Sequence, residues 1–170
     1  MYGRLAITSA LLAAPAVLAN DPHEPTGCSD IHILIARGWN EDYPGRNQYL
    51  VDAICADLPN QSCDYEDVVY DAWSTDYCPN VIKGEAAGLA QINTYYAKCP
   101  NSKLVVSGYS EGATIMEDIL AGGGGVDSDC GELFLPLSTV SGASCNIAAA
   151  VTFGNPRHTA NQSYNVNSRC

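Results

Sequence analysis

One stretch, Lys103–Leu120, constrains the fold of this chain more than any other. It opens with an apolar run, Leu104-Val105-Val106, which is typical of a strand buried on both faces of a sheet. The sequence Gly108-Tyr109-Ser110-Glu111-Gly112 follows at once, and Ala113–Leu120 has the pattern of a helix. A G-x-S-x-G pattern between a buried strand and a helix predicts a nucleophile elbow, a sharp turn that exposes a reactive serine.

The spacing of this pattern has a steric and an electrostatic reason. A turn this sharp forces Ser110 into a strained backbone conformation, so the residues two before and two after it must be small. The helix begins at the serine, and its free N–H groups favour an anion there. We therefore expect Ser110 to be a nucleophile and the backbone N–H of Glu111 to bind the oxyanion of an attacked ester. The alternative is an ordinary glycine-rich turn.

The first 19 residues have the pattern of a secretory signal peptide. Arg4 supplies a positive charge, Leu5–Leu18 is apolar, and Val17-Leu18-Ala19 resembles a cleavage site. This pattern predicts secretion, a tail over residues 20–27 and one domain over residues 28–170. The remaining segments are too short or too polar to span a bilayer, so no stable membrane insertion is expected.

Eight cysteines follow the predicted signal peptide: Cys28, Cys55, Cys63, Cys78, Cys99, Cys130, Cys145 and Cys170. In a secreted chain this number predicts disulfides, although the count leaves their pairing open. The spacings typical of zinc sites are absent, and we expect neither a metal nor a cofactor. Two Asn-x-Ser sequons, at Asn60 and Asn161, predict glycosylation.

The chain is acidic, with a formal net charge of −11 and only 8 lysines and arginines. These basic residues are scattered, whereas nucleic acids and anionic membranes require clusters of them. The charge is compatible with a neutral polymer or ester as the substrate, and we expect the protein to act as a monomer.

Hydrophobic patterns predict an alternating order of strands and helices. Beside the strand and helix that flank Ser110, the expected strands are Ile31–Ala36, Glu66–Trp73 and Ile147–Phe153, and the expected helices are Asn47–Leu58 and Val81–Cys99. The segment Asp127–Cys145 is expected to be irregular. This order predicts a three-layer α/β/α sandwich with a small parallel sheet. A small-residue face of the second helix, comprising Gly84, Ala87, Gly88 and Ala90, is expected to approach the sheet closely.

The chain contains three histidines, the residue type that most often serves as a general base. His23 lies in the polar lead-in and is expected to be solvated, whereas His32 lies in the first strand and is expected to be buried and hydrogen-bonded. A catalytic role for His32 is the alternative. His158 alone follows Ser110 in the sequence.

Five motifs, in order along the chain, carry a resemblance to a known family. They are Cys28-Ser29-Asp30-Ile31-His32-Ile33, Ala36-Arg37-Gly38, Cys99-Pro100, the Gly108–Gly112 elbow and Phe153-Gly154-Asn155-Pro156-Arg157-His158. Together they resemble the fungal cutinase and acetylxylan esterase family, secreted serine esterases of the α/β-hydrolase fold. The resemblance covers nearly all of the chain from Cys28 to Cys170.

The resemblance implies a role for particular residues. Ser110 matches the nucleophile, and the backbone N–H groups of Glu111 and Trp39 match the two oxyanion donors. Cys28 and Cys99 match a family disulfide that ties the first strand to the helix before the nucleophile strand. The implied activity is hydrolysis of acyl esters on plant cell-wall polymers, cutin or acetylated xylan, through an acyl-enzyme on Ser110.

Three single residues depart from the family pattern. The family usually has Gln at the position of Glu111, and a carboxylate there opposes the oxyanion unless it is turned away or protonated. It commonly has Ser or Thr at position 39, where Trp39 keeps the N–H but lacks the hydroxyl. It more often has Asp at the position of Asn155.

A fourth departure concerns the catalytic base. The family's Asp and His follow the loop that contains Asn155 and have no matching positions here, so we expect a C-terminally incomplete esterase domain. His158 is the candidate for a surrogate base, with Asp127 or Asp129 to orient it. The alternative is a truncated, catalytically impaired family member with a non-enzymatic role in contact with the cell wall or a host.

Overall fold

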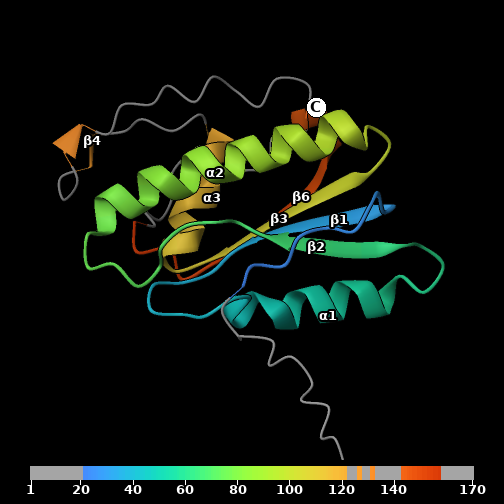
Figure 1. Cartoon of the computed structure of the whole chain (residues 1–170), viewed down its shortest axis with the longest axis horizontal. Coiled ribbons are helices and arrows are strands. Elements are labelled where there is room, and N and C mark those ends of the chain that lie inside the picture. The colour runs from blue at the N-terminus through green and yellow to red at the C-terminus, as the bar shows by residue number, and fades with distance from the viewer. Residues whose placement is uncertain (1–20, 122–125, 128–130, 133–142, 158–170) are drawn as a thin grey trace, which may run out of the picture.

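A parallel four-stranded sheet forms the centre of the protein, with strand order β2-β1-β3-β6. The computed structural model describes residues 21–121, 126–127, 131–132 and 143–157. The strands are β1 (Ile31–Ala36), β2 (Cys63–Asp67), β3 (Lys103–Tyr109) and β6 (Ile147–Phe153); the helices are α1 (Gln48–Asp57), α2 (Tyr77–Lys98) and α3 (Glu111–Ala121). Helix α1 covers one face of the sheet and α2 and α3 cover the other (Figure 1). The predicted α/β/α sandwich is confirmed.

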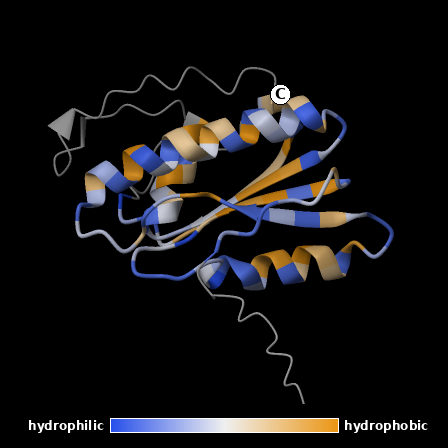
Figure 2. Ribbon diagram, viewed as in Figure 1, coloured by the Kyte–Doolittle hydropathy of each residue, from blue (hydrophilic) through white to orange (hydrophobic). Residues whose placement is uncertain are grey.

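The sheet has a separate apolar core on each face. Leu34, Leu104 and Val106 pack with α2 and α3 on one face, whereas Ile33 and Val105 pack with α1 on the other. Figure 2 shows β1 and β3 as mostly hydrophobic, because both strands are covered on both faces. The predicted bounds of β1 and β6 are confirmed.

The prediction for the second strand is wrong in its bounds. It placed the strand at Glu66–Trp73, whereas β2 spans Cys63–Asp67 and lies at the edge of the sheet. The parallel pairing of β2 with β1 ends at Ile35 and Asp67, because β1 itself ends at the next residue, Ala36. Beyond Val68 the chain bonds to side chains instead: Val69 N–H donates to Gln91 and Tyr70 N–H donates to Tyr43.

Helix α2 begins four residues earlier than predicted, at Tyr77 instead of Val81. Pro79 does not prevent this, because backbone N–H groups in the first turn of a helix have no acceptor within the helix, so the N–H that proline lacks is not missed there. The glycine face of α2 was expected to approach the sheet, but it packs mainly against α3. A Cβ atom at Gly84 would lie 2.3 Å from Ile115 Cδ1, and one at Gly88 would lie 2.7 Å from Ile119 Cδ1.

Helix α1 matches its prediction to within one residue at each end and is preceded by a 3₁₀ turn, Gly45–Asn47. The segment predicted to be irregular contains two short elements. Val126–Asp127 (β4) pairs antiparallel with Gly131–Glu132 (β5), and a 3₁₀ helix spans Ala143–Asn146. These elements are too short to produce a hydrophobic period in the sequence.

Two disulfides join described cysteines. Cys28 and Cys99 are bridged, with their Cα atoms 5.5 Å apart, which confirms the pairing that the resemblance implied. A second bridge joins Cys55 and Cys63, linking the end of α1 to the start of β2. Cys78 is also disulfide-bonded. In the described part of the chain, no helix is long and apolar enough to cross a membrane. The predicted signal peptide lies outside the described residues.

Candidate active site

Ser110 occupies the turn between β3 and α3 in a left-handed backbone conformation. Its φ is +53°, a region that non-glycine residues rarely adopt. A Cβ atom at Gly108 would lie 2.2 Å from the carbonyl oxygen of Gly112, and a Cβ at Gly112 would lie 2.0 Å from the carbonyl oxygen of Ala36. Both contacts are with backbone atoms that cannot rotate away. The predicted strain at the serine and the need for small residues around it are therefore confirmed.

The elbow is held from two sides. Ser110 N–H donates to the carbonyl oxygen of Phe153 at 2.8 Å, which ties the turn to the end of β6. The carbonyl of Ser110 accepts from the N–H of Ala113 at 3.0 Å and so begins the helical hydrogen bonds of α3. Because Glu111 is the first residue of α3, its N–H has no acceptor within the helix, as an oxyanion donor requires.

The segment after β1 lies against the elbow. The ring of Tyr109 lies 2.7 Å from where a Cβ of Gly38 would stand, and Arg46 Nη1 donates to the hydroxyl of Tyr109. Trp39 follows Gly38, and its indole N–H donates to the carbonyl of Ser74 at 3.0 Å while 54% of the residue stays exposed. The segment that carries Trp39 thus borders the nucleophile turn. Its role as an oxyanion donor remains a prediction.

Glu111 is fully buried one residue from the nucleophile. Its exposure is 0%, and neither carboxyl oxygen has a hydrogen-bond partner among the described residues. Burial raises the pKa of Glu111 to about 7, against the opposing effect of the Arg37 charge. A substantial fraction of these carboxyls is therefore neutral at neutral pH.

Arg37 is also buried beside the elbow, with 4% of its surface exposed. Its Nε donates to the carbonyl of Glu41 at 2.9 Å, its Nη2 donates to the carbonyl of Tyr70, and its guanidinium lies 3.6 Å from the ring centroid of Tyr43. The hydroxyl of Tyr70 donates back to the carbonyl of Arg37. These contacts hold the arginine without an ion pair to Glu111.

The loop after β6 is fastened to one side of α3. Asn155 Nδ2 donates to Glu117 at 2.6 Å, and Asn155 Oδ1 accepts from Thr114 Oγ1 at 3.0 Å. Arg157 Nη1 forms an ion pair of 3.2 Å with Asp118. The amide of Asn155 serves as donor and acceptor at once, which explains Asn at this position, because Asp would face the carboxylate of Glu117.

Sequence reasoning missed the α3 side of this arrangement. Thr114, Glu117 and Asp118 are spaced three and four residues apart on a helix, so they share one face. The available signal was this polar stripe on the helix that follows the nucleophile, but its partner loop at Asn155 lies 38 to 41 residues further along the chain.

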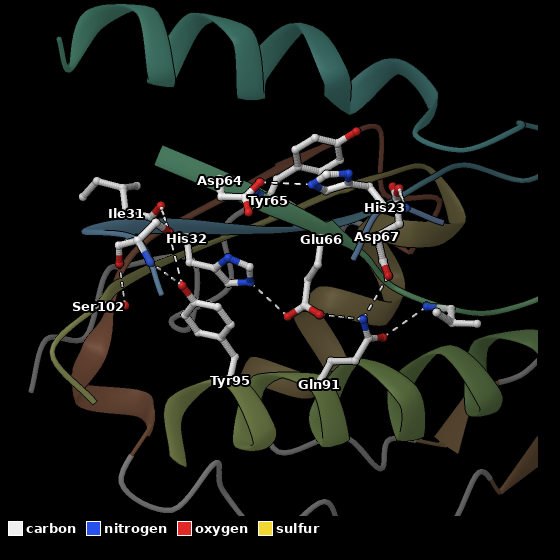
Figure 3. Close-up of polar contacts among 12 residues, drawn as sticks. His23, Ile31, His32, Asp64, Tyr65, Glu66, Asp67, Gln91, Tyr95 and Ser102 are labelled. Carbon is white, nitrogen blue, oxygen red and sulfur yellow. Dashed lines mark hydrogen bonds and ion pairs between the residues drawn. The ribbon is translucent and has the colours of Figure 1, made fainter. Parts of the chain in front are cut away.

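His32 is a structural histidine, as expected. It is fully buried and stacks on Tyr95 with ring centroids 3.5 Å apart, and its Nε2 bonds Glu66 at 3.0 Å (Figure 3). Glu66 accepts a further bond from Gln91 Nε2 at 3.0 Å. His32 pairs with Leu104, at the start of β3, so it lies at the opposite end of the strand from Ser110.

His23 is partly solvated, with 37% of its side chain exposed, but it also has partners that the sequence did not predict. Its Nε2 bonds Asp64 at 3.0 Å, its ring stacks on Tyr65 at 4.2 Å, and its backbone N–H donates to Asp67 at 2.8 Å (Figure 3). The polar lead-in therefore lies along the outer edge of β2, where the carboxylates of the strand bind it. Both described histidines bond carboxylates of β2, so neither serves Ser110.

The candidate base and the two aspartates proposed to orient it are not placed. His158 and Asp129 lie outside the described residues, and for Asp127 only the backbone, in β4, is described. Their roles stay predictions.

The parallel sheet and the strained serine between β3 and α3 define an α/β protein with a nucleophile elbow, the arrangement of the α/β-hydrolases. The chain belongs to the Cutinase family, whose family model matches residues 27–169.

Similar proteins of known name include acetylxylan esterases and cutinases. The chain is 29% identical to the acetylxylan esterase of Hypocrea jecorina and 32% identical to Cutinase 11 of Verticillium dahliae. These matches cover 95% and 94% of this chain but only 55% and 56% of the relatives. Among solved structures, the catalytic core domain of the Trichoderma reesei acetyl xylan esterase matches with a TM-score of 0.70 and 30% identity, over 81% of this chain and 68% of that one. The chain thus spans just over half the length of these two curated relatives.

Proposed function

We propose that the protein is a secreted serine carboxylic-ester hydrolase that acts on acyl esters of plant cell-wall polymers, cutin or acetylated xylan. The observation that carries the proposal is the backbone of Ser110, held at a φ of +53° between β3 and α3. Such strain persists only where the surrounding structure maintains it, and it exposes the serine hydroxyl at the end of the sheet. The names of the relatives support the class of substrate.

The proposed mechanism proceeds through a covalent intermediate. Ser110 Oγ attacks the ester carbonyl and loses its proton to a base, and the N–H groups of Glu111 and Trp39 stabilise the oxyanion. Collapse of the tetrahedral intermediate breaks the ester C–O bond, the base gives its proton to the leaving oxygen, and the alcohol departs while an acyl group stays on Ser110. Water activated by the same base then frees the acid. His158 is our candidate for that base.

Secretion is part of the proposal. Cys28, Cys55, Cys63 and Cys99 form disulfides, which persist in oxidising compartments. Asn60 of the first sequon is exposed and accessible to glycosylation.

Hydrolysis of p-nitrophenyl acetate by the purified chain and by Ser110→Ala tests the proposal. We expect the substitution to lower kcat/KM by about 10³-fold or more, because the hydroxyl is the nucleophile. His158→Ala, measured alongside, should show a loss of similar size if this histidine is the base. Release of acetate from acetylated xylan and of hydroxy fatty acids from cutin then separates the two substrates.

Equal rates for the purified chain and Ser110→Ala would contradict the proposal. The chain would then be a non-catalytic member of its family, with a binding role at the cell wall or a host surface.

A further inference from the structure

Glu111 combines two properties that conflict in an esterase. Its N–H is the proposed oxyanion donor, while its own side chain is a carboxyl that becomes negative when it ionises. Its exposure is 0%, and both oxygens lack a hydrogen-bond partner among the described residues. A carboxylate buried in this way has lost its hydration without replacement, which strongly favours the neutral form.

The groups that act on Glu111 come from two neighbouring segments. Arg37, at the end of β1, supplies the positive charge, and Asp71, after β2, supplies a negative one. The third group is the buried phenol of Tyr70, whose pKa is raised well above its ordinary value by burial. On α3 itself, the helix N-terminus favours the ionised form.

Arg37 does not cancel the effect of burial. Its Nε and Nη2 donate to backbone carbonyls, and Tyr43 covers the guanidinium. Its remaining nitrogen, Nη1, is buried and has no hydrogen-bond partner among the described residues. The arginine is thus held in place by neutral groups and forms no ion pair with the glutamate.

We propose that Glu111 is a neutral acid in the active enzyme and that its ionisation switches the esterase off at alkaline pH. The inference rests on the proposed function of Ser110. A negative charge one residue from the nucleophile, in a site of low dielectric, opposes the oxyanion that the N–H of Glu111 stabilises. The side chain of Glu111 would thereby set the upper pH limit of activity.

Glu111→Gln is the direct test, because an amide has the size of the carboxyl and stays neutral at every pH. We expect kcat/KM of the unsubstituted chain with p-nitrophenyl acetate to fall about 10- to 100-fold, relative to Glu111→Gln, between pH 6 and pH 9. Below pH 6 the ratio of the two kcat/KM values should no longer change with pH, because the carboxyl is then neutral. Glu85→Gln is the matched control, since it removes a second buried carboxyl of raised pKa on α2 and should keep the alkaline loss.

The free energy of unfolding, measured by urea titration over the same pH range, provides a readout that does not depend on activity. The unsubstituted chain should lose stability relative to Glu111→Gln as the pH rises from 5 to 8, because the folded state then holds a proton that the unfolded state releases. The inference would be overturned if the unsubstituted chain and Glu111→Gln gave the same pH profile of kcat/KM and the same pH profile of unfolding. The esterase function would remain intact in that case. If no variant hydrolyses the ester faster than Ser110→Ala, the proposed function fails and the activity switch fails with it. The unfolding curves then decide separately whether the buried carboxyl is neutral.

Discussion

The N–H of Ser110 donates a 2.8 Å hydrogen bond to the carbonyl of Phe153, so the nucleophile turn is joined to the last residue of strand β6. Two residues later, Asn155 binds Thr114 and Glu117 of the helix that begins at the turn. These backbone and side-chain contacts hold both the nucleophile turn and the loop that leads to His158. A change in any of these contacts should affect the elbow and the loop together.

Gly112→Ala should destabilise the protein by about 3 kcal/mol or more, at the upper end of what overpacking costs. The added Cβ would lie 2.0 Å from the carbonyl oxygen of Ala36, and the backbone must move to relieve the clash. Urea unfolding measures the loss. Gly27→Ala is the control, because a Cβ at Gly27 meets nothing within 4 Å. Equal effects of the two substitutions would show that the elbow is not tightly packed.

The buried strands and the elbow were predictable from local patterns. Leu104-Val105-Val106 is a continuous apolar run and Ile31–Ala36 is apolar apart from His32, which is typical of strands covered on both faces. The glycines around Ser110 are required by contacts within a few residues of the turn and the adjoining end of β1, so the motif itself contains the information.

The edge strand and the environment of Glu111 were not predictable in the same way. Strand β2 reads Cys-Asp-Tyr-Glu-Asp, and its polar side chains are explained by His23 and Gln91, which lie far away in the sequence. The burial of Glu111 depends in the same manner on segments around Arg37 and Tyr70. Single-sequence patterns report local periodicity and do not report such long-range partners.

Asn155→Asp should cost about 2–3 kcal/mol at pH 7, because it replaces the amide donor to Glu117 by a second carboxylate. Glu117→Gln in the same chain should recover most of the loss, since its amide can donate to the new carboxylate while its oxygen still accepts from Thr152. Urea unfolding of the two single variants and the double variant gives the coupling energy. Additive losses would show that the two side chains do not interact.

Glu85→Gln should stabilise the protein at alkaline pH. Burial, followed by the hydrogen bond and charge of Asp118, raises the pKa of Glu85 from 4.5 to about 8. Between these values the folded state binds more protons than the unfolded state, so stability falls as the pH rises. At pH 9 the variant should exceed the unsubstituted chain by on the order of a few kcal/mol, while at pH 4.5 the two should be similar.

Unfolding free energies at a series of pH values check this prediction. Glu24→Gln is the matched control, because it makes the same substitution at an exposed position. A parallel offset between Glu85→Gln and the unsubstituted chain at all pH values would mean that Glu85 ionises normally in the folded protein.

The two disulfides should differ in their contribution to stability. The bridge between Cys28 and Cys99 spans 71 residues, whereas that between Cys55 and Cys63 spans 8. Because a longer loop loses more conformational entropy in the unfolded chain, the double substitution Cys28→Ser/Cys99→Ser should cost about 4 kcal/mol and Cys55→Ser/Cys63→Ser about 2.5 kcal/mol. Urea unfolding of both variants under oxidising conditions measures the two losses. A larger loss at Cys55 and Cys63 would mean that their bridge acts through native contacts between α1 and β2 and not through the entropy of the unfolded chain.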